Sequence, residues 1–346
     1  MLKIFFIFVS HRHLNHLWIA YAAAFWMTFF SITPAVAGKP VPKNLFNIGD
    51  SIGEGNAADG TIGALRREAV WSTGYDVADR VFSFNERFEA ADAVNYFENS
   101  ATRDSFLNHA VSGAKMDDFA EQANNVANSA NLTPNNAVGS LTILMGNNDV
   151  CSESLESMTP PEQFESQYRA GLDVLAASSS TKTAYIHVTS IPAIYWLWQV
   201  KRQNTWCRLI AWPFVPCQNL LENPDNDCGA GDSDLDPDTI HVDDGPNCIR
   251  RKRFHAKIRD IYNPILKKVL QEYIDTGRLP NAYYVNIFDI QFAAVHVNDG
   301  DCFHPSIEGH ALMADVQWCR SPWGRYDRVC GHLLPAPWIP LLLLDE

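Results

Sequence analysis

Short apolar runs with the length of β-strands alternate along this chain with longer stretches in which apolar residues recur at helical spacing. The strand-like runs are residues 43–48, 106–111, 140–145, 183–190 and 283–288. The helical stretches are residues 76–98, 116–130, 161–177, 254–273 and 305–318, with a kink expected at Pro264. Because strands that alternate with helices form parallel sheets covered on both faces, we predict one α/β domain, a three-layer α/β/α sandwich. Such domains bind ligands at the carboxyl ends of their strands.

Residues 191–250 break this alternation and predict an insertion in the domain. Its first half is crowded with aromatic residues, and its second half is a loop rich in Gly, Asp and Pro. Four cysteines are spread across it, which indicates a disulfide-rich excursion from the sheet. Two interpretations of the aromatic residues stay open. Either they form the small core of the insertion itself, or they form an apolar lid or wall for an acyl chain.

The first 37 residues are typical of an export signal. Basic residues and several histidines precede residues 17–37, which carry no charged side chain and end in Ala35-Val36-Ala37. Small residues in this pattern mark a cleavage site, so we predict a signal peptide over residues 1–37 and a mature domain over residues 38–346. An uncleaved membrane anchor is the alternative, because the uncharged stretch is long enough to span a bilayer. In both cases the body of the protein is exported, which makes it secreted, either periplasmic or extracellular.

Eight cysteines, all placed after the predicted signal, indicate disulfides, because exported proteins fold in an oxidising compartment. Proximity in the sequence favours four pairs, which are Cys207–Cys217, Cys228–Cys248, Cys319–Cys330 and Cys151–Cys302. Bound zinc is the rival interpretation, and the absence of any CxxC pair weighs against it. We therefore expect no metal.

The balance of charge excludes two classes of partner. The formal net charge is −13, from 27 basic and 40 acidic residues. Nucleic acids and anionic membranes both attract basic surfaces. A chain this acidic is a poor candidate to bind either of them.

Gly49-Asp50-Ser51 places a serine directly after the first strand-like run. Gly49 lets the backbone turn sharply there, which is one way to expose a nucleophile. Serine alone is weakly nucleophilic and needs a base and oxyanion donors. Asp301 and His304, three residues apart on a tight turn, are suited to supply a base that a carboxylate orients.

Two further segments are suited to supply oxyanion donors. Gly113 follows the second strand-like run, where a glycine brings its backbone N–H close to a substrate oxygen. Asn148 lies in Gly146-Asn147-Asn148-Asp149 after the third strand-like run, and its side chain offers an N–H donor without adding charge.

The four segments, in this order, resemble the SGNH hydrolases, which are also called GDSL lipases and esterases. The resemblance covers residues 43–318 and implies a flavodoxin-like fold that needs no cofactor. It also implies that Ser51 is the nucleophile, His304 the base and Asp301 its orienting acid. The oxyanion hole would consist of the Ser51 N–H, the Gly113 N–H and the Asn148 side chain. A cysteine directly after Val150 and another inside Asp301-Cys302-Phe303-His304 are similar to the phospholipase B-like branch.

The insertion contains a second copy of two of these short patterns. Gly231-Asp232-Ser233 repeats the first, and Asp238-Thr239-Ile240-His241 repeats the Asp-x-x-His spacing. Both lie on one acidic loop with no apolar strand before it, so we expect them to be silent. Alternating aspartates between Asp232 and Asp243 resemble calcium ligands, but Pro237 stands where an EF-hand turn requires glycine. We expect a solvated acidic loop, with a weak calcium site as the alternative.

Together the motifs predict a secreted serine carboxylester hydrolase that acts on a small-molecule or lipid ester. The preferred substrate is a lipid ester such as a phospholipid acyl chain, with transient contact with lipid aggregates. One alternative is a carbohydrate acetylesterase of the same family, in which the tryptophans of the insertion would form a platform for a sugar. Another is an inactive scaffold that binds calcium or a glycan. The four intact segments argue against an inactive scaffold.

Overall fold

The computed structural model describes residues 39–91, 107–133, 135–324 and 330. The predicted signal peptide lies outside the described residues, as does the end of the helical stretch predicted over residues 76–98. None of the described helices is both long enough and apolar enough to cross a bilayer.

A parallel sheet forms the centre of the fold. Its strands run in the order β1-β2-β3-β4 and every neighbouring pair is parallel, with Leu45 opposite Ser140 and Ser140 opposite Tyr185. The strands are β1 (Leu45–Gly49), β2 (Ser140–Leu144), β3 (Tyr185–Thr189) and β4 (Tyr283–Val285). Each begins inside or at the edge of a run predicted to be a strand, so the alternating pattern located the sheet correctly.

The strand predicted over residues 106–111 is present only as an irregular edge. Asn47 of β1 donates its N–H to the Leu107 carbonyl (2.9 Å) and accepts from the His109 N–H (2.9 Å), which gives one parallel bridge at Asn108. The Val111 N–H still donates to the Gly49 carbonyl (3.1 Å), but the Gly49 N–H donates to Gln122 Oε1 (3.0 Å) instead of to this segment, so no second bridge forms. With this edge counted as the second strand in chain order, the sheet has the flavodoxin-like order 2-1-3-4-5.

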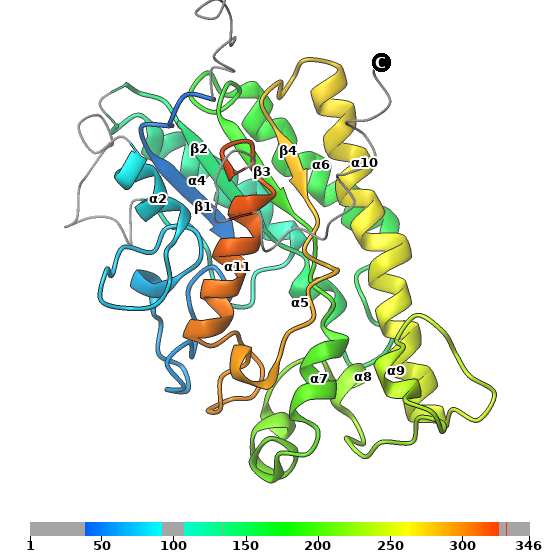
Figure 1. The fold of residues 1–346 in the computed structure, drawn as a ribbon. Helices are drawn as coiled ribbons and strands as arrows, with labels where there is room; N and C mark the ends of the chain where they lie inside the picture. The colour runs from blue at the N-terminus through cyan, green and yellow to red at the C-terminus, as the bar shows by residue number, and fades with distance from the viewer. Residues whose placement is uncertain (1–38, 92–106, 134, 325–329, 331–346) are drawn as a thin grey trace, which may run out of the picture. The chain divides into compact units, whose positions relative to one another are not determined.

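Helices cover both faces of the sheet, so the predicted three-layer sandwich is confirmed (Figure 1). Phe46 and Ile48 of β1 pack in the core layer beneath α4, α6 and α10, whereas Leu45 packs in the layer with α2 and α11. Both alternating sets of side chains are buried, as expected for a strand covered on two sides. The helices of these two layers are α2 (Phe84–Ala91), α4 (Phe119–Ala130), α6 (Pro161–Ala177), α10 (Asn263–Asp275) and α11 (Ile307–Cys319).

The first of these helices begins later than the sequence pattern predicts. Residues 76–83 form turns in which the side chains of Asp76 and Asp79 accept backbone N–H groups (3.0 and 2.6 Å). Ser83 then caps α2, because its Oγ accepts the Glu86 N–H (3.1 Å) while the Glu86 carboxylate accepts the Ser83 N–H (2.8 Å). This reciprocal cap fixes the start of the helix, and apolar spacing alone did not reveal it.

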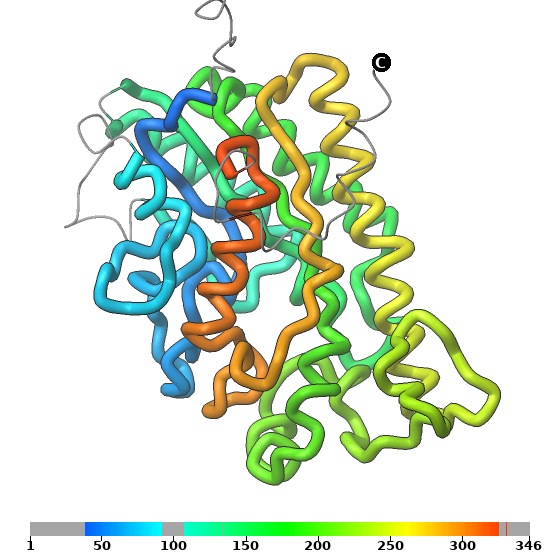
Figure 2. The backbone as a smooth tube through the Cα atoms, in the orientation of Figure 1, coloured from blue at the N-terminus to red at the C-terminus, as the bar shows by residue number. Residues whose placement is uncertain are grey.

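The helix predicted over residues 254–273 is part of a longer run that turns irregular before Pro264. The helix α9 (Pro246–Lys257) continues through a π-helical turn, η6 (Ile258–Tyr262), into α10. Proline has no N–H and its ring clashes with the carbonyl four residues earlier, so a widened turn accommodates it. The kink predicted at Pro264 stays a prediction, with a π-helical turn directly before that residue, and Figure 2 shows the two helices as one continuous run in yellow-green and yellow.

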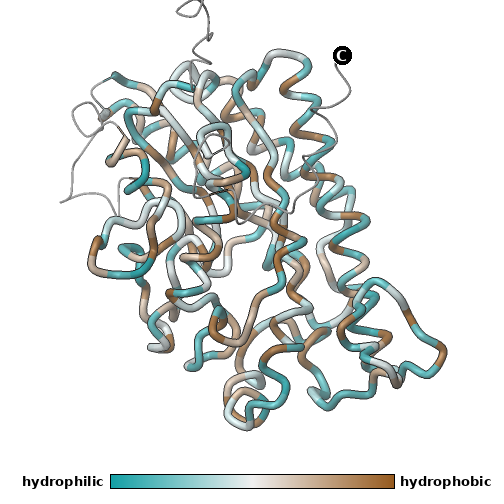
Figure 3. The backbone as a smooth tube through the Cα atoms, in the orientation of Figure 1, coloured by the Kyte–Doolittle hydropathy of each residue, from teal (hydrophilic) through white to brown (hydrophobic). Residues whose placement is uncertain are grey.

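The insertion consists of short helical pieces at the carboxyl ends of the strands. They are α7 (Tyr195–Lys201), η3 (Cys207–Ala211), η4 (Trp212–Phe214), α8 (Gln218–Leu221) and η5 (Ser233–Leu235). Figure 3 shows hydrophobic positions along α7 and the segment that follows it. Tyr195, Trp198 and Trp212 are buried in the main core, so most of the aromatic residues have a packing role.

All eight cysteines form disulfides, and two of the four predicted pairs are correct. Cys228–Cys248 and Cys319–Cys330 are confirmed. The predicted pairs Cys207–Cys217 and Cys151–Cys302 are wrong, because the actual bridges are Cys151–Cys217 and Cys207–Cys302. Pairing by proximity ignored that the insertion folds back onto the ends of the strands. There it meets both the loop after β2 and the loop that carries Asp301.

Candidate active site

Ser51 lies two residues beyond the end of β1, where the chain leaves the sheet. Gly49, the last residue of β1, is held in place by Gln122 of α4, which exchanges two hydrogen bonds with its backbone (2.9 and 3.0 Å). The Ser51 carbonyl accepts the Asn56 N–H (3.0 Å), which closes a tight loop behind the serine. Ser51 is 9% exposed, so its hydroxyl sits at the floor of a depression.

The turn that carries Asp301 and His304 places both side chains in line with Ser51. His304 Nε2 lies 2.8 Å from Ser51 Oγ, and His304 Nδ1 lies 2.7 Å from Asp301 Oδ2. Burial acts to raise the pKa of Asp301, but hydrogen bonds from His304 and from the backbone N–H of Phe303 outweigh it and hold that pKa below its ordinary value. An ionised carboxylate therefore faces the Nδ1 side of the imidazole, as a histidine base requires.

Asn298 holds this turn in place, and the sequence analysis missed it. Its Nδ2 donates to Asp301 Oδ1 (2.7 Å) and to the His304 carbonyl (2.9 Å). Its Oδ1 accepts the N–H groups of Gly300 and Asp301, both at 2.9 Å. The run Asn298-Asp299-Gly300-Asp301 is a turn signal that pointed to this role, because asparagine side chains commonly accept from the backbone two residues ahead.

Asn148 and Gly113 lie on two different loops beside Ser51. Asn148 is on the short helix α5 (Asn147–Val150), and it lines the same cavity as Ser51 and His304. One of its amide hydrogens donates to the Ala114 carbonyl (2.9 Å), which orients the side chain and leaves its second hydrogen for a ligand. Gly146, which begins α5, has φ +104°, and a Cβ there would lie 2.9 Å from Ile191, so only glycine fits.

A buried carboxylate holds the loop that contains Gly113. Glu54 accepts both the N–H and the hydroxyl of Ser112, each at 2.6 Å, and it forms an ion pair with Arg67. Asn56 Nδ2 also donates to Ser112 Oγ (3.2 Å). Gly113 itself has φ +84° and is not among the residues that line the cavity. The loop is thus tied to the Ser51 loop through Ser112, a link that the spacing of motifs did not predict.

Asp50 lies directly under the nucleophile loop and is fully buried. Its carboxylate accepts from Asn147 Nδ2 (2.8 Å) and from the Ile52 N–H (3.0 Å). Burial raises the pKa of Asp50 from 3.8 to about 6, because these neutral hydrogen bonds compensate only part of the lost hydration. Asp50 and Asn147 therefore connect the loops after β1 and β2.

The cavity beside Ser51 has an apolar wall. The volume accessible to the centre of a water molecule is about 70 Å³. Side chains from the insertion and from the loop before α11 contribute to the wall, among them Ile194, Leu197, Phe292, Val297 and Phe303. The polar groups converge at one end, where Ser51, Asn148 and His304 meet. An apolar cavity with a few polar groups at one end is typical of a small-molecule site.

The second Gly-Asp-Ser forms a separate structural cluster. Ser233 is buried, donates to Asp244 (2.6 Å) and accepts from Lys252 Nζ (2.7 Å), which is also paired with Asp244 (2.9 Å). His241 instead contacts Asp236 at 3.1 Å. Ser233 and His241 are therefore not hydrogen-bonded to each other, whereas Ser51 and His304 are.

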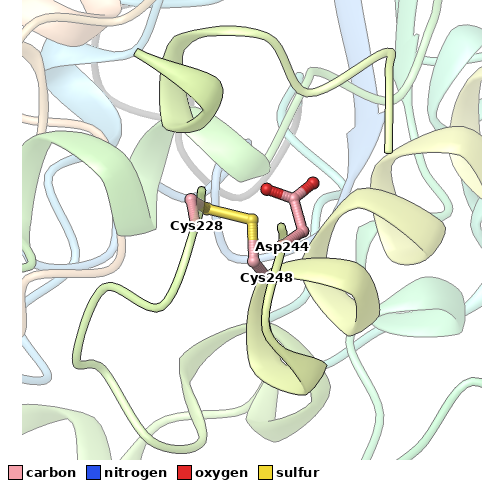
Figure 4. Close-up of side chains that lie close together, drawn as sticks. All are labelled: Cys228, Asp244 and Cys248. Carbon is pink, nitrogen blue, oxygen red and sulfur yellow. A yellow bond between two sulfur atoms is a disulfide. The ribbon is translucent and has the colours of Figure 1, made fainter. Parts of the chain in front are cut away.

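Carboxylates in the acidic loop of the insertion are bonded to other groups of the protein. Asp234 pairs with Arg202 and Asp238 with His255 and Arg259, while Asp243 accepts the Ala230 N–H (2.8 Å). Cys228, Asp244 and Cys248 lie close together, but the two sulfur atoms form a disulfide (Figure 4). The Asp244 carboxylate is paired with Lys252 and accepts a hydrogen bond from Ser233. This chemistry does not fit a metal, because disulfide sulfurs are not thiolate ligands.

Comparison with known protein families finds one match. A family model described as GDSL-like Lipase/Acylhydrolase matches residues 45–316, which contain Ser51, Gly113, Asn148, Asp301 and His304. The match covers more than half of the chain. It spans all strands of the sheet, from β1 to β4, and extends into α11. No curated protein matches the chain.

Proposed function

The chain belongs to the GDSL-like lipase/acylhydrolase family, and we propose that it is a secreted serine carboxylester hydrolase with Ser51 as its nucleophile. Membership of the family supports ester hydrolysis in general. The observation that carries the finer proposal is the continuous hydrogen-bonded series from Ser51 Oγ through His304 to Asp301, with links of 2.8 and 2.7 Å. This is the arrangement of nucleophile, base and orienting acid that acyl transfer requires.

The proposed reaction proceeds in two acyl-transfer steps. Ser51 Oγ attacks the ester carbonyl while His304 Nε2 takes its proton, and His304 then returns this proton to the departing alcohol. The acyl group remains on Ser51 as an ester. Water, deprotonated by His304, attacks that ester, and His304 then gives this proton to Ser51 Oγ as the acid departs, which restores the free serine. Asp301 stays ionised throughout and stabilises the imidazolium that forms in each step.

Three N–H groups would stabilise the negative charge that develops on the carbonyl oxygen. They are the backbone N–H groups of Ser51 and Gly113 and the free amide hydrogen of Asn148. The hydrogen bond from Asn148 to the Ala114 carbonyl supports this assignment, because it fixes the amide before substrate arrives. Preorganised donors of this kind cost no rearrangement at the moment of reaction.

The apolar wall of the cavity favours an acyl group as the part of the substrate that it contacts. We propose a lipid ester, such as a phospholipid acyl chain, as the substrate. A carbohydrate acetylesterase is the second candidate, and the small cavity of about 70 Å³ favours it, because a short acyl group fills such a space. Against it, three of the four tryptophans of the insertion, Trp196, Trp198 and Trp212, are buried, which leaves only Trp206 exposed as a platform for a sugar.

The four disulfides fit a protein that folds in an oxidising compartment. We propose that residues 1–37 are the signal peptide that directs the chain there. N-terminal sequencing of the protein isolated from the secreting cell tests this step. A mature chain that begins at Gly38 is the expected result, and a chain that begins at Met1 would contradict it.

The decisive experiment measures hydrolysis of a series of p-nitrophenyl esters from acetate to palmitate. Wild type is compared with Ser51→Ala and with Ser233→Ala, a matched serine in the second Gly-Asp-Ser. We expect Ser51→Ala to lose at least about 10³-fold in kcat and Ser233→Ala to keep its activity. Activity that survives in Ser51→Ala sinks the assignment of the nucleophile. A strong preference for acetate favours the acetylesterase, and inactivity of wild type on every ester favours a binding module.

A further inference from the structure

A helical segment of the insertion exposes its apolar side to solvent. Residues 205–214 form a continuous helical run that includes η3 and η4. Four of its large apolar residues are exposed, and we call them the apolar stripe: Trp206, the adjacent pair Leu209 and Ile210, and Phe214. Leu209 is 66% exposed and Phe214 is 87% exposed. Exposed apolar side chains that gather on one helical face mark a contact surface, whereas scattered ones do not.

The same segment is fixed to the turn that carries the proposed base. Cys207 is buried and forms a disulfide with Cys302, the residue directly after Asp301. The Trp212 indole donates to the Cys302 carbonyl (3.0 Å), and the Trp206 indole donates to the Gly300 carbonyl (2.8 Å). One covalent bond and two hydrogen bonds thus hold the segment of the stripe against the loop that carries Asp301 and His304.

The segment that carries the stripe is bonded close to the wall of the cavity. Cys207 is joined to Cys302, and the next residue, Phe303, lines the cavity together with Leu197 of α7. Figure 3 shows hydrophobic positions along α7 and the segment that follows it. Asn204 joins the two, since its side chain accepts the N–H groups of Trp206 (2.9 Å) and Cys207 (3.3 Å) at the start of the segment.

The charges beside the apolar stripe and the net charge of the chain indicate which kind of apolar partner it fits. The cations beside the stripe are each paired with a carboxylate: Lys201 with Asp299 (2.6 Å), Arg202 with Asp234, and Arg208 with Asp225. The chain carries a net charge of −13, so an anionic surface would be repelled. A second copy of the chain is a poor occupant, because a stable dimer buries about 20–30 residues a side and the stripe has four.

We propose that the apolar stripe docks the enzyme onto a zwitterionic phospholipid surface, with the mouth of the Ser51 cavity brought to the ester groups. This inference rests on the proposed function and deepens it, because it assigns the surface through which aggregated substrate is reached. The stripe residues enter the boundary between headgroups and acyl chains, where apolar side chains leave water. The disulfide Cys207–Cys302 keeps the docked segment and the Asp301–His304 turn in one rigid unit.

Co-sedimentation with phosphatidylcholine vesicles tests the proposal. The variant Leu209→Ser/Phe214→Ser removes two stripe side chains, and Val77→Ser/Val242→Ser is the matched control, since both valines are strongly exposed elsewhere on the chain. We expect the stripe variant to bind vesicles at least about tenfold more weakly than wild type does. The control variant should bind like wild type. Wild-type binding should not change between about 50 and about 500 mM NaCl, because it does not depend on charge.

A second readout separates docking from folding and chemistry. The stripe variant should hydrolyse water-soluble p-nitrophenyl butyrate within about twofold of wild type, and vesicle-borne ester about tenfold more slowly. Equal losses in stripe and control variants would overturn the proposal. So would binding to anionic vesicles alone, or a wild-type dimer in sedimentation equilibrium that the stripe variant dissociates without any vesicle binding. Wild type that sediments with vesicles but cleaves no ester upholds docking and refutes the hydrolase.

Discussion

The ionisation of Asp50 offers a quantitative test of the electrostatics beneath the nucleophile loop. Its carboxyl is fully buried and accepts two neutral hydrogen bonds, from Asn147 and Ile52. Burial raises its pKa from 3.8 to about 6. Each pKa unit corresponds to about 1.4 kcal/mol, so keeping this carboxylate ionised in the folded state costs about 3 kcal/mol.

The direction of the pH dependence follows from the two pKa values. Because the folded pKa of about 6 exceeds the unfolded value of 3.8, the folded protein holds a proton on Asp50 between these pH values while the unfolded chain has lost it. The favourable contribution of the protonated group is complete below about pH 4 and is lost as the pH rises through about 6. Wild type therefore loses stability over this window on account of Asp50.

The perturbation is Asp50→Asn, and the assay is thermal unfolding with the disulfides intact, at a series of pH values from about 4 to about 8. The asparagine that replaces Asp50 loses the hydrogen bond that Asn147 donates to the carboxylate, but that loss does not depend on pH. The difference in unfolding free energy between variant and wild type should therefore shift by about 2–3 kcal/mol in favour of the variant from about pH 4 to about pH 7. For a mature domain of this length, this is about 5 °C in the difference of midpoints.

Asp117→Asn is the matched control, because it removes an exposed carboxylate from the next loop of the site. Its difference from wild type should be flat over the same range. If the Asp50→Asn and wild-type midpoints instead move in parallel with pH, Asp50 is solvated as well in the folded state as in the unfolded chain. That result would refute the inference that burial raises the pKa of Asp50.

Three further outcomes test other parts of the site. Asn148→Ala should lower kcat by about 10²–10³-fold with little change in KM, as removal of an oxyanion donor does, and an unchanged kcat would remove Asn148 from that role. Glu54→Gln should lower kcat by about tenfold or more on p-nitrophenyl butyrate, because the neutral amide grips the Ser112 N–H less well; full activity would show that Gly113 needs no such support. Replacement of Cys207 and Cys302 by alanine should destabilise the protein by about 4.7 kcal/mol, against about 2.8 kcal/mol for Cys319 and Cys330, because the first pair closes a loop of 95 residues and the second a loop of 11. Chemical denaturation measures both values, and the reverse order would contradict the entropic explanation.

Much of the sheet and part of the site were predictable because their signals are local. A buried strand such as β2 is a short apolar run bounded by turns, and its neighbours along the chain supply the covering helices. Asp301 and His304 are three residues apart on one turn, so their pairing needed no tertiary information. The irregular edge at Asn108 and the late start of α2 were missed, since each depends on hydrogen bonds between a side chain and the backbone, from Gln122 at the edge and between Ser83 and Glu86 at the helix.

The groups that support the site were not predictable from spacing. Asn298, Glu54 and Asn147 act by contacts with loops that the fold brings to the same end of the sheet. The bridges Cys151–Cys217 and Cys207–Cys302 escaped prediction for the same reason, since each joins the insertion to a loop distant in sequence. A short motif does not carry the identity of its tertiary partner.

The sequence by itself determined the class of fold and indicated the candidate side chains for the chemistry, because hydrophobic period and turn residues act over a few positions. Only the tertiary structure decided that Ser51 and His304, 253 residues apart, lie 2.8 Å from each other, and that the equally short motif at Ser233 lacks such a partner. It also decided which aromatic residues of the insertion are core and which form the exposed stripe. Parallel strands end at one edge of the sheet, and long-range packing there selects which loops meet.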